Sequence, residues 1–175
     1  MAADDLYLVL LGSGDADYEA GLREAAAAYP EHIAARIGYD EALAHKIEAG
    51  ADMFLMPSQY EPSGLNQMYS MRYGTVPVVR STGGLDDTIE DGTGFKFEDY
   101  SAQALLEAIR TASNAFQDRK GWEAMMRRGM LKDYSWRVSA SEYAALYHRL
   151  LDGGNTAASF GSKQDPIQLG VRDGR

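Results

Sequence analysis

Short apolar runs alternate with longer stretches in which apolar and polar residues are mixed. Leu6–Leu11 is a continuous apolar run, the pattern typical of a strand buried on both faces of a sheet. Ala16–Tyr29 is rich in Ala and Glu, which favours a helix, and Pro30 ends it. The same alternation predicts further strands at 32–37, 52–56, 76–80 and 95–97, and helices at 39–49 and 64–73.

Strands separated by helices of this length predict βαβ crossovers and a parallel sheet. We therefore expect an α/β fold with a Rossmann-like, doubly wound parallel sheet followed by C-terminal helices. One of these helices follows a Ser101 cap and has an apolar face of Leu105, Ala108, Ile109 and Ala112. Another follows Ser135, and its apolar face consists of Trp136, Ala140, Tyr143, Tyr147 and Leu150.

Composition supports one compact domain and excludes several classes of function. The chain has 175 residues, 45% of them hydrophobic, which is enough for a real core. Its net charge of −9 argues against broad binding of nucleic acid or anionic membranes, which needs a basic face. The absence of cysteine excludes disulfides and thiolate metal sites.

The two ends of the chain suggest where the domain lies and where the protein works. The first residues, MAADDLYLVLLG, lack the basic region of a signal peptide, and no apolar run approaches the roughly 20 residues of a membrane span. We therefore expect a cytoplasmic protein. From Asp152 onward the chain is rich in Gly, Ser and Asp and shows no periodicity. We expect one domain at 1–151 and a disordered tail at 152–175.

Loops that follow the predicted strands are the strongest unaided indication of a ligand site. In a doubly wound sheet, ligands bind beyond the carboxyl ends of the strands, where such loops converge. Each of these loops is rich in Gly, Ser, Thr or other polar residues: Gly12–Gly14, Gly38–Tyr39, Pro57–Gly64 and Ser81–Leu85.

The segment from Pro57 turns at Glu61 and enters a predicted helix at Gly64. The first amide groups of a helix are unpaired and lie at its positive end, so a phosphate fits there, each contact contributing about 0.3–1 kcal/mol. Gly64 has no side chain to block the approach, and the Asn66 amide can donate. Glu61 would oppose a phosphate but would suit sugar hydroxyls; equally, it caps the helix or is solvated. The pattern alone leaves both interpretations of Glu61 open.

Two further positions are weaker candidates. Thr82, Gly83 and Gly84 follow a strand, and a glycine pair lets backbone approach a ligand closely, although an ordinary loop is the commoner explanation. Tyr39 could stack on a base, a contact worth about 1–3 kcal/mol, although a half-buried tyrosine is commoner. The three histidines lack the spacing of metal ligands, and we expect them to be structural or surface residues: His32, His45 and His148.

The stretch Ile37–Thr88 resembles the glycogen and starch synthases, retaining glucosyltransferases with the two-domain GT-B fold. It reads IGYDEALAHKIEAGADMFLMPSQYEPSGLNQMYSMRYGTVPVVRSTGGLDDT. A looser resemblance extends from Leu6 to Trp136 and includes the GTGF turn at 92–95. It implies that the chain is the single C-terminal, nucleotide-sugar-binding domain of such an enzyme.

The resemblance implies a role for each candidate residue. Tyr39, after Gly38, would stack on the adenine of ADP, and Glu61 would face the donor glucose and favour an oxocarbenium-like transition state electrostatically. The diphosphate would bind at Gly64, Leu65 and Asn66, and the glucose and diphosphate would be lined by Thr82, Gly83 and Gly84.

Two positions depart from the pattern of related transferases. Ser63 replaces the usual Cys, a small change that we expect to be tolerated. Tyr69 stands where many related retaining transferases have a second Glu, so a carboxylate contact to the ribose is not assumed.

The resemblance also implies partners. They are ADP-glucose, the non-reducing end of an α-1,4-glucan and an N-terminal GT-B domain that this chain lacks; no metal, cofactor, nucleic acid or membrane is expected. The chain alone should bind ADP weakly and transfer no glucose. A UDP-sugar-dependent GT-B transferase and a non-catalytic nucleotide-binding module remain alternatives.

Overall fold

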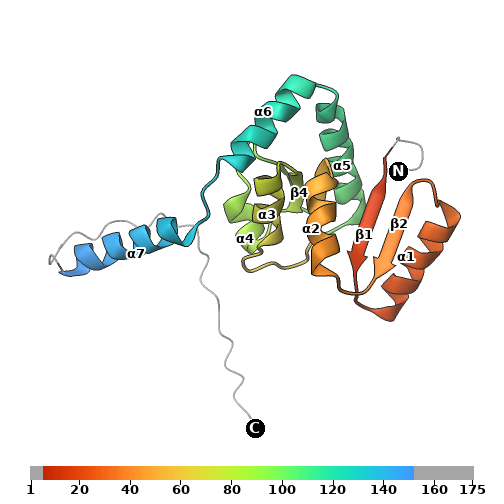
Figure 1. The fold of residues 1–175 in the computed structure, drawn as a ribbon, viewed down its shortest axis with the longest axis horizontal. Helices are drawn as coiled ribbons and strands as arrows, with labels where there is room; N and C mark the ends of the chain where they lie inside the picture. The colour runs from red at the N-terminus through yellow and green to blue at the C-terminus, as the bar shows by residue number, and fades with distance from the viewer. Residues whose placement is uncertain (1–5, 152–175) are drawn as a thin grey trace, which may run out of the picture. The chain divides into compact units, whose positions relative to one another are not determined.

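The computed structural model describes residues 6–151, which form alternating strands and helices (Figure 1). The strands are β1 (Leu8–Gly12), β2 (Ile33–Ile37), β3 (Met53–Met56), β4 (Val76–Arg80) and β5 (Phe95–Phe97). The helices are α1 (Ala16–Ala28), α2 (Glu41–Gly50), α3 (Asn66–Tyr73), α4 (Gly83–Thr88), α5 (Ala102–Phe116), α6 (Arg119–Met130) and α7 (Trp136–Leu151). Among the described residues, no helix is both long and apolar enough to cross a membrane.

The strands are parallel, which confirms the expected α/β class, and they form two sheets. β1 pairs with β2, with Leu8 opposite Ile33, and α1 is the crossover between them (Figure 1). The other sheet has the order β3-β4-β5, with Val78 opposite both Leu55 and Phe95.

Strand β4 is the centre of the core, because each of its faces packs against a different layer. Val79 packs with α3 and α4 in a cluster of Met71, Leu85, Ile89 and the half-buried Met56. Val78 packs on the opposite side with Phe97 of β5 and with Ala108 and Ala112 of α5. The two valines have no exposed surface. Burial on both faces explains why β4 is an apolar run and why its predicted bounds agree with the structure.

Strand β1 differs from its prediction. We expected 6–11 to be buried on both faces, but the strand runs from Leu8 to Gly12 and is half-exposed, with 53% of Val9 accessible. Its hydrogen-bonded neighbour within the described residues is β2 alone. The expectation of burial was wrong because an apolar run indicates a potential for burial, whereas actual burial needs neighbours on both faces.

Two helices were not predicted. The residues of α4 were interpreted as part of a loop, because a six-residue helix that begins with two glycines has no helical pattern. No element was assigned to 119–130, where α6 forms, although Trp122, Met125, Met126 and Met130 have the spacing of one apolar helix face. By contrast, α5 begins one residue after its predicted cap, since the Ser101 hydroxyl accepts a hydrogen bond from the Ala104 amide at 3.2 Å.

The described residues divide into two units, with the boundary between Asp133 and Tyr134. The second contains α7, whose predicted apolar face is exposed: Trp136 is 87% accessible and Tyr143 60%. The disordered tail predicted at 152–175 lies outside the described residues.

Candidate functional site

The site is built around the loop that joins β3 to α3. Gly64 has a φ of +71°, a conformation that L-residues with side chains rarely adopt, and it turns the chain into the helix. The helix begins at Asn66, two residues later than predicted, and Leu65 is its N-cap. Leu65 makes no side-chain capping bond, so the amide end of α3 is not blocked by a side-chain cap.

The glycine pair of α4 packs against this loop. The Gly84 amide donates a hydrogen bond to the Glu61 carbonyl at 3.0 Å. A Cβ added at Gly83 would collide with the Glu61 carbonyl oxygen, and one at Gly84 would collide with the Ser63 backbone. The lack of side chains therefore lets α4 approach the protein's own Glu61–Ser63 backbone, a reason for the pair that the sequence did not reveal.

Gln67 lies beneath the same loop and is fully buried. Its Nε2 is 3.0 Å from the Ser63 carbonyl oxygen and 3.1 Å from that of Gly64. The same nitrogen is 3.1 Å from Thr88 Oγ1 of α4. Gln67 was not predicted as a site residue, because the sequence does not distinguish a buried glutamine in a short helix from an exposed one.

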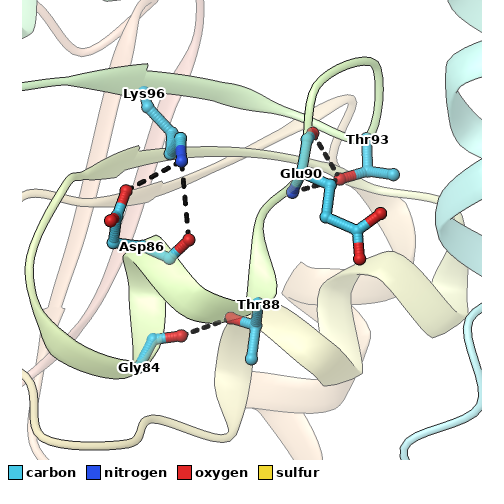
Figure 2. A network of polar contacts seen from close by, with 6 residues as sticks. All are labelled: Gly84, Asp86, Thr88, Glu90, Thr93 and Lys96. Carbon is cyan, nitrogen blue, oxygen red and sulfur yellow. Dashed lines mark hydrogen bonds and ion pairs between the residues drawn. The ribbon is translucent and has the colours of Figure 1, made fainter. Parts of the chain in front are cut away.

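Polar contacts on the other side of α4 fix it to β5 (Figure 2). Lys96 Nζ of β5 is 2.7 Å from the Asp86 carboxylate of α4. Within α4, Thr88 Oγ1 donates to the Gly84 carbonyl at 2.5 Å. Just after the helix, the Thr93 hydroxyl bonds to both the amide and the carbonyl of Glu90, at 3.0 and 2.8 Å. α4 is thus held from both sides.

Arg80, at the end of β4, supports the first part of the site loop. Its guanidinium donates to the Gln59 carbonyl at 2.6 Å and to the Glu98 carbonyl at 3.0 Å. It also lies over the Tyr100 ring, 5.6 Å from the ring centroid. Arg80 was not predicted either; its position as the last residue of a buried strand was the available signal.

Two predicted side chains of the site have no polar partner among the described residues. Glu61 is half-buried, and no hydrogen bond or ion pair to its carboxylate is present in this part of the chain. Thr82 has the extended backbone of an N-cap, with a φ of −155°, yet its hydroxyl makes no capping bond. Both groups therefore retain their hydrogen-bonding capacity for a ligand.

Gly38 and Tyr39 lie at the end of the other sheet. The Gly38 amide donates to the Gly12 carbonyl at 2.9 Å, so the ends of β1 and β2 are adjacent, as the loop argument predicts. Tyr39 is 88% exposed, which leaves its ring faces open to stacking. No hydrogen bond or ring contact between described residues joins Tyr39 to the Glu61 loop.

Tyr69 faces α2 across an aromatic cluster. Its ring centroid is 6.2 Å from that of His45, and the Tyr73 hydroxyl is 3.3 Å from His45 Nδ1. Nearby, Glu48 is 5% exposed and its Oε2 has no hydrogen-bond partner among the described residues. Burial raises the pKa of the Glu48 carboxyl, and His45, 3.8 Å away, lowers it to a smaller extent. This cluster connects α2 to the helix that begins at the site.

The described residues contain no group of three or more His, Asp or Glu side chains that could hold a metal ion. The groups available at the site are backbone amides, the Glu61 carboxylate, the Ser63 and Thr82 hydroxyls and the Asn66 side-chain amide. Such a set suits a ligand with an anionic part and a hydroxyl-rich part.

The family profile described as glycosyl transferases group 1 matches residues 2–127, which include all of these loops. The chain belongs to the group 1 glycosyl transferases. Each predicted site residue of this transferase chain, from Gly38 to Gly84, lies inside the matched range.

Similar curated proteins are bacterial glycogen synthases. The chain is 58% identical over 159 residues to the glycogen synthase of Anaeromyxobacter dehalogenans strain 2CP-1, covering 87% of this chain and 33% of that protein. It is 51% identical over 150 residues to the glycogen synthase of Myxococcus xanthus, covering 84% of this chain and 31% of that one. The chain thus spans about a third of the length of these relatives.

Solved structures of other proteins have the same fold as this chain. The catalytic domain of starch synthase IV from Arabidopsis thaliana, bound to ADP and acarbose, matches with a TM-score of 0.75 and 33% identity, over 86% of this chain and 34% of that one. A sucrose-phosphate synthase from Thermosynechococcus elongatus matches with a TM-score of 0.60 over 83% of this chain and 39% of that one; at 23% identity it supports the fold alone. The GT-B type of α/β fold is therefore confirmed for this glycosyl transferase chain.

Proposed function

We propose that this chain is the donor-binding part of an α-1,4-glucan synthase that transfers glucose, with retention, from ADP-glucose to the non-reducing end of a glucan. The relatives named glycogen synthase and the starch synthase that binds ADP support this choice of donor and product. The chain itself would bind the nucleotide and the transferred sugar.

One arrangement carries the proposal: a carboxylate without a partner lies in the loop that leads to an uncapped helix end. The diphosphate would accept hydrogen bonds from the first amides of α3, at Leu65 and Asn66, where the helix dipole is positive. Gly64 is needed for its positive φ and because a Cβ there would lie 2.6 Å from Gln67 Oε1. This mode of binding needs no metal and no cofactor.

Glu61 would act on the sugar and not on the phosphate. In a retaining transfer, positive charge develops at the sugar ring as the bond to the diphosphate breaks. A fixed carboxylate nearby stabilises that charge, because it is already oriented when the charge appears. The Thr82 hydroxyl and the Gly83 amide would line the glucose and diphosphate beside Gly84, whose own amide is bonded to the Glu61 carbonyl. Tyr39 would stack on the adenine.

The rest of such an enzyme would supply the acceptor site. The chain spans about a third of the length of its relatives, so the proposal includes an N-terminal GT-B domain that binds the glucan. The proposal also includes a cytoplasmic location. Stacking, one charge-assisted hydrogen bond and the helix dipole together contribute roughly 3–7 kcal/mol. Association costs roughly 4 kcal/mol or more, so the chain alone should bind ADP with an affinity in the millimolar range.

The test is a titration of the chain with ADP, in which the amide chemical shifts are measured by NMR at each step. We expect shifts at Gly64–Asn66 and Gly83–Gly84, a weaker response to UDP, and weaker binding by Tyr39→Ala. Tyr18→Ala, which alters an exposed tyrosine on α1, is the matched control and should bind as the wild type does.

Two outcomes would contradict the proposal. Micromolar affinity for ADP would refute the predicted weak binding by the chain alone. Transfer of labelled glucose to glycogen by the chain alone would refute the assignment of the acceptor site to another domain. Absence of any shift with ADP would favour a domain without this ligand, and preference for UDP would favour a transferase with a different donor.

A further inference from the structure

We propose that Gln67 and Thr88 are positioning residues that set the distance between the Glu61–Gly64 loop and α4. Their effect on the donor rests on the function proposed above; their effect on the loop does not. Neither side chain was singled out by the sequence, and neither lies among the groups assigned to the ligand. They act through the Glu61–Gly64 backbone and through Gly84.

Four hydrogen bonds link the Glu61–Gly64 loop and the adjoining α3 to α4 in a closed circuit. Gln67 Nε2 donates to the Ser63 carbonyl at 3.0 Å and to Thr88 Oγ1 at 3.1 Å. Thr88 Oγ1 donates to the Gly84 carbonyl at 2.5 Å. The Gly84 amide donates to the Glu61 carbonyl at 3.0 Å, which returns the circuit to the loop. Each of the two segments is therefore held at two points.

The donors and acceptors of the circuit determine its direction. The Thr88 hydroxyl has one hydrogen, which points to the Gly84 carbonyl, so Thr88 accepts from Gln67. The three neighbours of Gln67 Nε2 are then all acceptors, so the side chain presents its NH₂ group to them, and its two hydrogens are shared among the three. Its Oε1 has no partner among the described residues, so nothing favours the opposite orientation. The position requires a donor, and a carboxylate cannot supply one.

The circuit connects the parts of the site that must act together. Glu61 and the amide end of α3 lie on one segment, whereas Thr82 and the glycine pair lie on the other. A change in the spacing would move the carboxylate relative to the groups that hold the diphosphate. Full burial of Gln67 excludes water from competing for these bonds.

The experiment compares variants of this chain by two measurements. Hydrogen exchange at the Gly84 amide, without ligand, reports the bond to Glu61 and hence the spacing. The ADP titration reports the consequence for binding. Thr88→Val removes the hydroxyl at constant shape, Thr88→Ser keeps it, and Gln67→Glu replaces donors by acceptors. Ser70→Ala is the matched control, because Ser70 is as buried on α3 as Gln67 is. Its hydroxyl donates to the backbone carbonyl of Gln67 and not to the site loop.

We expect Thr88→Val to accelerate Gly84 exchange, because the bonds of the hydroxyl to Gln67 and to Gly84 are both lost. ADP binding should weaken about fivefold through the altered spacing. Gln67→Glu should have a larger effect on both, and Thr88→Ser should match the wild type. Ser70→Ala should lower the melting temperature without changing either measurement. If Gln67→Glu does not fold, Thr88→Val decides alone.

Unchanged Gly84 exchange in folded Thr88→Val would overturn the inference, as would an equal acceleration in Ser70→Ala. If the wild type does not respond to ADP, the proposed function fails, but the exchange measurement still decides whether these residues set the spacing.

Discussion

At the scale of single residues, the surroundings of a glycine determine what its missing side chain does. Gly84 lies against the Ser63 backbone, so a Cβ there would overlap main-chain atoms that have no freedom to move aside. Gly21, in the exposed middle of α1, has no atom within 4 Å of an added Cβ. The same residue type is therefore required at one position and is merely tolerated at the other.

We predict opposite effects of alanine at these two positions. Gly84→Ala should lower the free energy of unfolding by about 2 kcal/mol through overpacking and should disturb the amide shifts of the site loop. Gly21→Ala should raise it by about 0.5–1 kcal/mol, since Ala is the better helix former. Urea denaturation measures both. A neutral Gly84→Ala would mean that α4 does not approach the loop as closely as described.

Glu48 is a second residue whose environment determines its contribution. Its pKa is raised by burial, so between the ordinary value of 4.5 and the raised value the folded chain binds more protons than the unfolded chain. The contribution of Glu48 to stability is therefore fully present below the ordinary pKa and is lost as the pH rises through the folded pKa.

Glu48→Gln should remove this pH dependence. At pH 7 we expect the variant to be more stable than the wild type by about 1 kcal/mol, because no charge remains buried without a hydrogen bond. The difference should shrink as the pH falls through the raised pKa of Glu48 toward the ordinary value of 4.5. Thermal melts at several pH values measure it, with the exposed Glu123→Gln as the control for the change in net charge. A Glu48→Gln chain less stable than the wild type at pH 7 would show that the carboxylate is compensated.

At the scale of elements, local chemistry determines where several helices begin. α2 and α5 each start after a residue whose side chain accepts a bond from a first-turn amide: Asp40 from Leu43 at 3.0 Å, and Ser101 from Ala104 at 3.2 Å. α6 also follows an acidic residue, Asp118, but that side chain makes no capping bond. A capping residue type is thus a good but incomplete signal.

Removing a cap should therefore matter only where the capping bond exists. We predict that Ser101→Ala lowers the free energy of unfolding by about 1 kcal/mol. Asp118→Ala should lower the free energy of unfolding by less, because it removes only a negative charge near the start of α6. The comparison is made by chemical denaturation at one pH. Equal losses in the two variants would contradict the assignment of Ser101 as a functional cap.

At the scale of the molecule, the boundary at Asp133 separates two units. We predict that a chain ending at Asp133 melts at the temperature of the full chain and keeps the amide shifts of Val78 and Val79. A chain ending at Phe116 should not fold, because it lacks Trp122, which is 3% exposed and lies 6.1 Å from Phe95 between ring centroids. A fall in the melting temperature of the first truncated chain would show that 1–151 behaves as one domain, as the sequence alone suggested.

The sequence by itself determined the alternation of strands and helices, the parallel topology, the Ser101 cap and the loops of the candidate site. These features depend on residues close in the chain, because periodicity, caps and turns act over a few positions. Only the tertiary structure decided that Gly84 packs on Ser63, that Gln67 reaches Thr88, and that β1 is half-exposed. Each of these depends on which distant segments become neighbours, and hydrogen-bond partners and burial are properties of neighbours, which a residue's type does not specify.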